Sequence, residues 1–364
     1  MGVEGESNAE DFERTRDATP RHSAGACVPG TPVQLNGARS QPAMSTPLVT
    51  AMACVTISCP EPDRLLRLIT DLCGWEVFCA TELDSDLEQL WGIRAGSAGR
   101  SATIVRSPGS GRGMIRVVEG APRRLVSPFA QRWSGVEIVV SRDLTGLCQA
   151  LDRHPDFRLR KAVGQADFTD ADANVHDFFH GTLPGAGYAM FTMAVTEPAS
   201  YDFPSTENHV GHIFDVHLNV DSQGESRRFY AQTLGMERVF DANLSEGIFY
   251  DAWDLDPSAP DVRMSIFKGD APGFGEGGIE MRCLDRTLLA QDPPSLASLD
   301  GGCCLTTFTT EDINAAFHAV NRCTGATLIT EPKRLLRPPY DHGRAFAFLA
   351  PDGERVEIAE RWQR

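Results

Sequence analysis

The same change of pattern, from an alternating strand to an amphipathic helix, occurs four times along this chain of 364 residues. The four strands lie at residues 53–58, 135–141, 214–220 and 305–310. In the first and third strands apolar residues recur at every second position, and after each of the four strands the residues switch to helical spacing. Such repetition indicates internal structural repeats. The sequence therefore predicts four similar strand–helix–strands units and argues against one continuous parallel sheet.

The expected helix ends support this division into units. Gly74 and Gly235 follow the first and third helical stretches, where a glycine C-cap is common. Asp143 and Asp312 precede the second and fourth helical stretches. A carboxylate at this position can accept a hydrogen bond from a free backbone N–H of the first turn. Residues 197–208 are rich in Pro, Ser and charged residues, and they predict a linker between the second and third units.

The first 47 residues have a different composition from the rest of the chain. They are rich in Gly, Pro, Ser, Ala and charged residues and contain few large apolar side chains. Such a segment cannot bury enough surface to offset the entropy lost on ordering. We therefore expect residues 1–47 to be a disordered, dispensable tail. The remaining chain is long enough for two modules, at residues 48–196 and 209–364.

Charge and cysteine usage restrict the partners and the compartment. The formal net charge of −16 argues against a nucleic-acid or anionic-membrane surface, because both require basic patches. No apolar run approaches the roughly 18 residues that a membrane helix needs. Most of the ten cysteines lie within apolar runs, and the Cys-x-x-Cys spacing is absent. These features predict a reduced, cytoplasmic protein.

Two motifs in the second half of the chain carry a resemblance. One is the helix end Phe229-Tyr-Ala-Gln-Thr-Leu-Gly235, and the other is the turn and strand Ala350-Pro-Asp-Gly-Glu-Arg-Val-Glu-Ile358. In this order and spacing the chain resembles the vicinal oxygen chelate superfamily, which includes glyoxalases, bleomycin-resistance proteins and extradiol dioxygenases. The resemblance is weaker in the first module, where Leu68-Ile69 replaces Phe-Tyr. It implies an α+β fold of two modules, each made of paired βαβββ units that form a curved, incomplete barrel around a cavity.

The candidate metal ligands follow from strand alternation and from the resemblance together. Alternation places Asp215, His217 and Asn219 on the cavity side of their strand. The resemblance puts Asp215 at the first ligand position, Leu305 at the second and Glu357 at the third. We therefore expect Asp215, His217 and Glu357 to hold a divalent metal such as Fe, Mn or Zn. The alternative is a metal-free polar cavity wall, because leucine cannot coordinate a metal.

Four side chains are expected to carry the chemistry. His217 and Glu357 would act as acid–base groups as well as ligands. Tyr340 and His342 belong to a Pro-rich loop that the resemblance places at the cavity mouth, where they could donate a proton to a bound substrate. A structural turn with polar tips is the alternative for that loop.

No other metal site is expected. In the first module the corresponding positions are Cys54, Val136 and Met190, so that module is interpreted as structural or as a second wall of the binding cleft. Two histidine pairs are interpreted as structural. His176 and His180 are expected to be partly exposed beside a Phe-rich strand, and His209 and His212 to pack between the halves or face solvent.

The resemblance implies an enzyme that acts on a small oxygenated compound, aromatic or carbonyl, in the cavity of the C-terminal module. A glyoxalase-like lyase or isomerase and a divergent dioxygenase are both open, although Leu305 weighs against extradiol chemistry. The alternative function is metal-free binding of a small molecule, as in resistance proteins. The expected partner is a small-molecule substrate, without nucleic acid or membrane, and a homodimer remains open.

Overall fold

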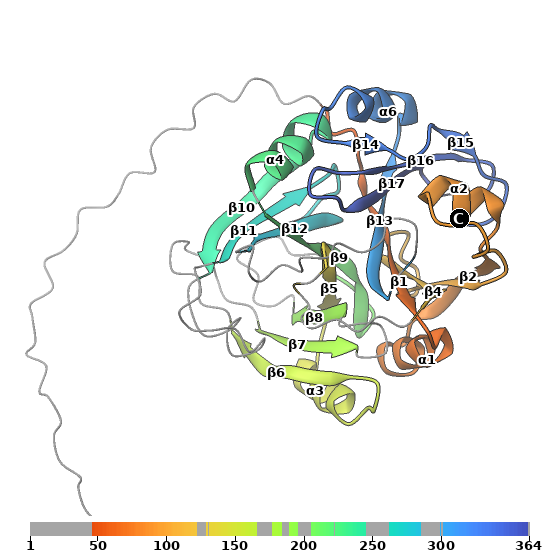
Figure 1. Ribbon diagram of the computed structural model, residues 1–364. Helices are drawn as coiled ribbons and strands as arrows, with labels where there is room; N and C mark the ends of the chain where they lie inside the picture. Colours follow the sequence, from red (N-terminus) through yellow and green to blue (C-terminus); the bar gives the residue numbers. More distant parts are fainter. Residues whose placement is uncertain are drawn as a thin grey trace, which may run out of the picture. The chain divides into compact units, whose positions relative to one another are not determined.

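The computed structural model describes residues 46–121, 129, 131–165, 177–183, 189–195, 205–221, 223–244, 262–284, 299 and 301–362. Residues 1–45 of the expected tail, and most of the expected linker, lie outside the described residues. Within the described residues the four predicted βαβββ units are present. They build two mixed sheets with few helices, which confirms the predicted α+β fold class (Figure 1).

One sheet is formed by the first and fourth units, and we call it the 1/4 sheet. Its nine strands run in the order β14-β16-β17-β13-β1-β4-β3-β2, with β15 paired to β16. The strands of the first unit are β1 Ala51–Cys59, β2 Glu76–Glu82, β3 Ser101–Arg106 and β4 Met114–Glu119. Those of the fourth are β13 Gly302–Thr310, β14 Thr327–Leu328, β15 Lys333–Arg334, β16 Arg344–Leu349 and β17 Arg355–Glu360.

The other sheet is formed by the second and third units, and we call it the 2/3 sheet. Its eight strands run in the order β10-β11-β12-β9-β5-β8-β7-β6. The second unit supplies β5 Trp133–Val140, β6 Arg158–Gln165, β7 Asp177–Leu183 and β8 Ala189–Val195. The third supplies β9 Val210–Val220, β10 Glu237–Leu244, β11 Val262–Lys268 and β12 Gly278–Cys283.

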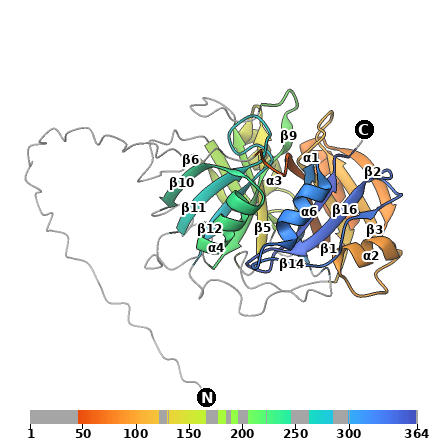
Figure 2. The same cartoon turned by 90° about the horizontal axis from the view of Figure 1, so that it is seen from above.

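The expected modules at residues 48–196 and 209–364 would have paired the first unit with the second and the third with the fourth. The observed pairing corrects this division. Instead β1 pairs antiparallel with β13, and β5 pairs antiparallel with β9. The first and last units therefore share a sheet (orange and blue in Figures 1 and 2), and the middle units share the other. Because β9 takes the free edge of β5, the edge of β1 is left for β13.

Gly74, Asp143 and Asp312 mark helix ends as the sequence predicts, whereas the helix α2 Ser85–Trp91 was not predicted. The helices are α1 Pro62–Cys73, α2 Ser85–Trp91, α3 Leu144–Asp152, α4 Gln223–Arg228 with its π-helical continuation η3 Phe229–Thr233, and α6 Ile313–Asn321. Gly74 ends α1 with a left-handed φ of 69°. Asp143 and Asp312 accept backbone N–H groups at the starts of α3 and α6, as predicted. Among the described residues, no helix is long and apolar enough to span a membrane.

Strand alternation separates the core from the polar faces. Val55, Val136 and Val216, from three different units, belong to one hydrophobic core that extends through both sheets. A second cluster lies on the opposite face of the 1/4 sheet and includes Leu90 and Ala347, where α2 contacts β16. In β9 the alternate residues point away from the core, which leaves a polar row on the inner side of the 2/3 sheet.

The two sheets meet at a close backbone contact. The Ile213 N–H donates to the Gly113 carbonyl at 3.0 Å, and the Gly113 N–H donates to the Met52 carbonyl at 3.2 Å. Gly113 has a φ of 61°, and a Cβ added there would lie 2.1 Å from the carbonyl oxygen of Ile213. Only glycine fits this position without moving one sheet away from the other.

We predict that Gly113→Ala lowers the free energy of unfolding by about 3 kcal/mol or more, because it combines a left-handed backbone with a clash between backbones. Gly109→Ala is the matched control, since Gly109 also has a positive φ, of 79°, but nothing lies within 4 Å of its added Cβ. The control should lose about 1 kcal/mol. Urea denaturation measures both values, and equal losses would show that the contact between the sheets is not tight.

Candidate metal centre

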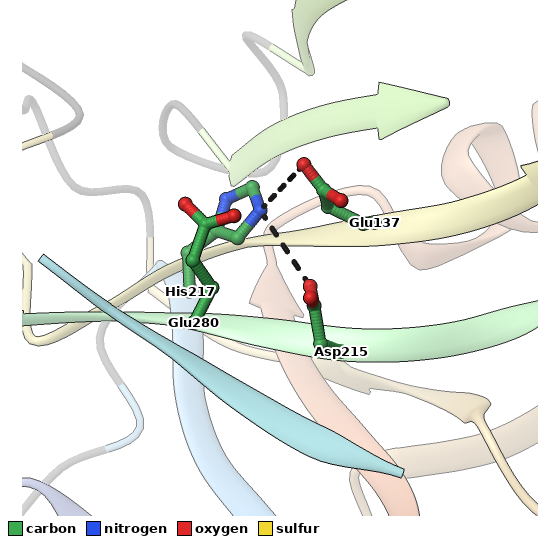
Figure 3. Close-up of side chains that lie close together, drawn as sticks. All are labelled: Glu137, Asp215, His217 and Glu280. Carbon is green, nitrogen blue, oxygen red and sulfur yellow. Dashed lines mark ion pairs between the residues drawn. The ribbon is translucent and has the colours of Figure 1, made fainter. Parts of the chain in front are cut away.

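Four ionisable side chains of the 2/3 sheet converge on one point (Figure 3). Glu137 comes from β5, Asp215 and His217 from β9, and Glu280 from β12. The strand register brings them together, because Asp215 is paired with Glu137 and His217 with Glu280. One ligand atom from each of the four lies within 4.8 Å of those of the others. We call these four residues the carboxylate–histidine cluster.

The spacing of the cluster suits a shared ion better than direct hydrogen bonds. The Nε2 atom of His217 lies 3.6 Å from Oε1 of Glu137 and 3.9 Å from Oδ1 of Asp215. Both separations exceed the usual length of a hydrogen bond. A metal ion bonded to each ligand at about 2.0–2.2 Å holds neighbouring ligand atoms roughly 3 to 4 Å apart. The observed distances fall in that range.

The two residues of β9 are buried without hydrogen-bond partners among the described residues. Asp215 and His217 are both 0% exposed. In the described part of the chain, no hydrogen bond is made by either carboxylate oxygen of Asp215 or by either ring nitrogen of His217. A buried polar atom left unpaired costs about 1–3 kcal/mol, and more if it is charged. A bound cation would supply the missing interaction for both residues, so the donor set fits a metal.

The pKa shifts within the cluster also favour a bound metal ion. Burial and the neighbouring Glu280 raise the pKa of Glu137 to about 8. Burial, with Glu137 and Glu280, raises the pKa of Asp215 well above its usual value. Burial lowers the pKa of His217 well below its usual value, so the imidazole is neutral and its lone pair is available to a metal. Arg282 donates to Glu280 and offsets one of the three carboxylates.

His180 lies closer to this centre than the sequence suggested. It is only 2% exposed, which corrects the expectation of a partly exposed histidine. Its Nδ1 is hydrogen bonded to the hydroxyl of Thr192 at 3.0 Å. Burial lowers the pKa of His180, and His180 in turn contributes to the lowered pKa of His217. His176, the other member of that pair, lies outside the described residues.

The sequence identified half of this cluster. Asp215 and His217 lie together on the inner face of β9, as alternation predicts. Glu137 and Glu280 were missed. Glu280 could have been found, because it stands in the alternating strand Gly278–Cys283. Glu137 stands in the same kind of pattern, between Val136 and Ile138, but it becomes a neighbour of Asp215 only through the β5–β9 pairing, which the sequence did not predict.

Glu357 is not part of the cluster, which corrects the predicted ligand set. It lies on β17 of the 1/4 sheet and is 0% exposed. The indole N–H of Trp91 donates to its Oε2 at 2.5 Å, and the hydroxyl of Tyr340 donates to its Oε1 at 3.0 Å. Nη1 of Arg116 lies 3.8 Å from the same carboxylate. Glu357 therefore faces a cation that the chain itself supplies.

We call this second group the Arg116 centre, which consists of Trp91, Arg116, Tyr340, Glu357 and Trp362. The guanidinium carbon of Arg116 lies 4.9, 5.9 and 5.6 Å from the ring centroids of Trp91, Tyr340 and Trp362. Three aromatic faces and one carboxylate thus surround a cation that is 3% exposed. The positive charge next to Glu357 opposes the binding of a metal ion there.

The remaining predicted residues also belong to the 1/4 sheet or its loops. Tyr340 is buried in the Arg116 centre, whereas His342 is exposed in a turn with a φ of 73°. Leu305 is buried in the apolar cluster on the same face. His212 is hydrogen bonded at 2.8 Å to the buried Glu276, which belongs to the same half of the chain, so this contact is not the expected packing between the halves.

A sequence profile gives an independent view of the chain. Residues 208–358 match the Glyoxalase/Bleomycin resistance protein/Dioxygenase superfamily. This match covers the third and fourth units, and the second half of the chain is thus similar in sequence to that superfamily. No curated protein sequence is similar enough to the chain to count as a match.

Solved structures show which known proteins have a similar fold. Glyoxalase I from Zea mays is 13% identical, has a TM-score of 0.55, and is matched over 85% of this chain and 92% of its own. A putative dioxygenase from Bacillus subtilis is 10% identical, has a TM-score of 0.54, and is matched over 87% and 86%. At these identities the likeness concerns the fold, which does not decide the reaction.

The raised pKa values give a pH dependence for the metal-free protein. A carboxyl whose pKa is higher in the folded state stabilises folding fully below its unfolded value, near 4, and loses that contribution as the pH rises through the folded value, about 8 for Glu137. We predict that the free energy of unfolding falls by about 3 kcal/mol between pH 5 and pH 8 in the presence of EDTA. Glu137→Gln should flatten this fall.

The matched control is Glu225→Gln, an equal change of charge on the exposed surface of α4. Urea denaturation at pH 5, 6, 7 and 8 measures all three proteins. The control should reproduce the pH dependence of the wild type. If Glu137→Gln did so as well, the buried carboxyls would not govern it.

Proposed function

We infer that this protein is a metal-dependent lyase or isomerase that acts on a small carbonyl compound at the carboxylate–histidine cluster. The observation that carries the proposal is the pair of fully buried residues, Asp215 and His217, whose polar atoms make no hydrogen bond to the described residues. Such a cost is tolerated at functional sites, where a ligand supplies the missing interactions. The similarity of residues 208–358 to the Glyoxalase/Bleomycin resistance protein/Dioxygenase superfamily supports an enzyme of this general kind.

The side chains of the cluster favour a divalent ion that binds oxygen ligands. The cluster offers three carboxylates and one imidazole. Carboxylates suit Mn²⁺, and an imidazole among them also suits Fe²⁺ or Zn²⁺. Asp215, His217 and Glu280 are the most buried donors and would hold the ion. Once bound, the ion would polarise a substrate carbonyl as a Lewis acid.

Glu137 is the member of the cluster best placed to move a proton. Its side chain is 13% exposed, whereas those of Asp215 and His217 are 0% exposed. Glu137 is therefore more accessible to a small molecule than these two residues. We assign Glu137 Oε1 as the acceptor of a proton from the carbon next to the carbonyl, and as its donor on the return step. Arg282 keeps Glu280 in place through its own contact.

The composition of the cluster favours proton transfer over oxygen activation. Fe(II) oxygenases commonly use two histidines and one carboxylate. Here one imidazole accompanies three carboxylates, and the other buried histidine nearby, His180, is hydrogen bonded to Thr192. From the sequence, Leu305 weighs against extradiol chemistry, because it stands at an expected ligand position and cannot coordinate a metal. It has no bearing on this centre, because it lies on the 1/4 sheet. Lyase or isomerase chemistry therefore fits this centre better than extradiol cleavage.

The test is exchange of the proton next to a carbonyl. Protein loaded with Mn²⁺ is incubated with hydroxyacetone in D₂O, and deuterium incorporation is followed by NMR. The wild type should incorporate deuterium above the protein-free rate. Glu137→Gln should lower the enzymatic rate by about 10² to 10⁴, the usual contribution of a general acid–base group. His217→Ala should abolish the dependence on Mn²⁺.

Glu357→Gln is the control that separates the two centres, since Glu357 was the ligand expected from sequence. Its exchange rate per Mn²⁺-bound protein should stay within about threefold of the wild type. Exchange that survives in Glu137→Gln at the wild-type rate would contradict the role of Glu137. Oxygen consumption with catechol, in place of exchange, would show that the cluster supports a dioxygenase.

A further inference from the structure

A large polar pocket lies where the two sheets meet, away from the carboxylate–histidine cluster. Its volume is about 1160 Å³, which is large enough for a small organic molecule. It is lined by residues of β1, of the turn between β3 and β4, of β9 and of the segment that follows β11. None of the four residues of the cluster lines it. The proposed lyase or isomerase chemistry therefore makes no use of this pocket.

Backbone hydrogen bonds at the start of β1 hold one wall of the pocket together. Besides the two bonds already described for Gly113, the Met52 N–H donates to the Gly277 carbonyl at 2.8 Å. The Ala271 N–H donates to the Thr50 carbonyl at 3.1 Å. Three segments far apart in the sequence are thus bonded to the same short stretch of β1. We call this set of bonds the backbone junction.

Four ionisable side chains stand directly before residues of the backbone junction. Each occupies the position before Gly113, Ile213, Ala271 or Gly277, and they are Arg112, His212, Asp270 and Glu276, respectively. The first three line the pocket. Glu276 is 1% exposed and does not line it. Because the backbone beside each side chain is hydrogen bonded at the junction, the positions of all four are fixed before any ligand binds.

Glu276 connects two of the pocket side chains. The Nε2 atom of His212 and the Nε atom of Arg112 lie 2.8 and 2.6 Å from the same carboxylate oxygen, Oε1 of Glu276. His212 and Arg112 are therefore neighbours in the pocket wall. The buried carboxylate orients the imidazole and the guanidinium, and the guanidinium compensates its charge.

Both neighbours keep polar atoms that a ligand can reach. A carboxylate can only accept, so Nε2 of His212 is the donor, and the neutral ring carries its lone pair on Nδ1. Nδ1 makes no hydrogen bond to the described residues, and it is not among the side-chain atoms that are sealed from solvent. The Arg112 side chain is 39% exposed, and its two Nη groups make no hydrogen bond within the described chain. An acceptor and several N–H donors thus lie side by side.

The third side chain, Asp270, adds an exposed carboxylate to the same pocket. It forms neither a hydrogen bond nor an ion pair with the described residues. The chain beside it is closely packed on β1, since a Cβ added at Gly269 would lie 2.6 Å from the Thr50 carbonyl oxygen. The Asp270 carboxylate is therefore held at the pocket but is available to a cation.

The charges of the pocket favour a ligand that carries both signs. Its lining contains three arginines and three carboxylates, which are Arg106, Arg112, Arg361, Glu207, Asp270 and Glu311. A purely anionic or purely cationic ligand is repelled by one of these sets. An α-amino acid carries an ammonium and a carboxylate on one carbon, as the adjacent acceptor and donors require. The partly exposed hydroxyl residues Thr50 and Ser110 favour a polar side chain.

We propose that this pocket is a second, metal-independent site that binds small polar α-amino acids as zwitterions. The Nη groups of Arg112 donate to the ligand carboxylate. The ligand ammonium donates to Nδ1 of His212 and pairs with Asp270. The volume leaves room for a longer polar side chain and for bridging water. Metal-free binding, the alternative expected from the sequence, is thus assigned to a place of its own in the same chain.

The experiment follows the imidazole signals of the full-length protein, labelled with ¹⁵N at its nine histidines, in the presence of EDTA. L-Serine is titrated as the probe, and the signals lost in His212→Gln assign His212. We expect a saturable shift of the His212 Nδ1 signal, because its lone pair gains a hydrogen bond. His180, whose Nδ1 is already bonded to Thr192, should stay unshifted.

Two analogues of the probe test each charge of the ligand on the wild-type protein. N-Acetyl-L-serine has no ammonium, and L-serinamide has no carboxylate. Each should bind about fivefold more weakly than L-serine or worse, because each loses a hydrogen bond between charged groups at a partly exposed site. The acetyl group fits the volume of the pocket, so added bulk does not explain weaker binding.

Two variants test the protein side of the same contacts. Arg112→Gln should weaken L-serine binding about fivefold or more, and Asp270→Asn about threefold. Asp270 is exposed, so its variant tests the site even where Arg112→Gln lowers stability by leaving Glu276 less compensated. The matched controls are Arg322→Gln and Asp63→Asn, exposed residues outside the lining, and both should bind like the wild type.

Three outcomes would overturn the proposal. One is the absence of a saturable shift at His212, and another is equal affinity of Asp270→Asn and the wild type for L-serine. The third is binding of N-acetyl-L-serine or L-serinamide as tight as that of L-serine, which would mean that one charge alone determines the ligand. Because EDTA is present throughout, these results are independent of the proton-exchange test.

Discussion

Burial of several carboxylates inside the 2/3 sheet is the constraint on which the account of function depends. Removing a carboxylate from water without a compensating partner is costly, and here three lie around one neutral imidazole. Arg282 compensates Glu280, but Asp215 has no hydrogen bond to either oxygen. The fold keeps these groups together because they stand on paired strands of a sheet whose opposite face is the hydrophobic core. A divalent cation is the simplest means of offsetting the charge.

The two sheets solve the same electrostatic problem in different ways. In the 1/4 sheet the buried Glu357 is compensated within the chain, by Arg116 and by hydrogen bonds from Trp91 and Tyr340. In the 2/3 sheet Arg282 is paired with Glu280, whereas the described residues offer no hydrogen bond to the carboxylate of Asp215. Two sheets of the same architecture thus hold two different centres. In the Arg116 centre the charge of Glu357 is compensated by Arg116, whereas the carboxylate–histidine cluster fits an ion.

Most of the fold could be predicted from the sequence, because it depends on local signals. Asp143, Asp312 and Gly74 mark helix ends through bonds to nearby backbone atoms, and alternation in β9 separates Asp215 and His217 from Val216. These features depend on a few neighbouring residues. They are therefore visible in the sequence before any tertiary contact is known.

The pairing of the units could not be predicted, and the errors in the site follow from it. All four units have the same pattern, so alternation does not show whether β9 lies beside β5 or beside β13. The choice depends on contacts distant in sequence, such as the backbone bonds of Gly113 with Met52 and Ile213. Once β9 is paired with β5, Glu137 becomes a neighbour of Asp215, and Glu357 belongs to the other sheet.

The most direct test of the central claim is anomalous diffraction from crystals of the full-length protein soaked in MnCl₂, recorded at the manganese absorption edge. The account predicts one strong peak, about 2.0 to 2.3 Å from donor atoms of Asp215, His217 and Glu280. No peak should lie beside Glu357, where Arg116 supplies the positive charge. A peak between Tyr340 and Glu357, or none at the carboxylate–histidine cluster at millimolar Mn²⁺, would contradict it.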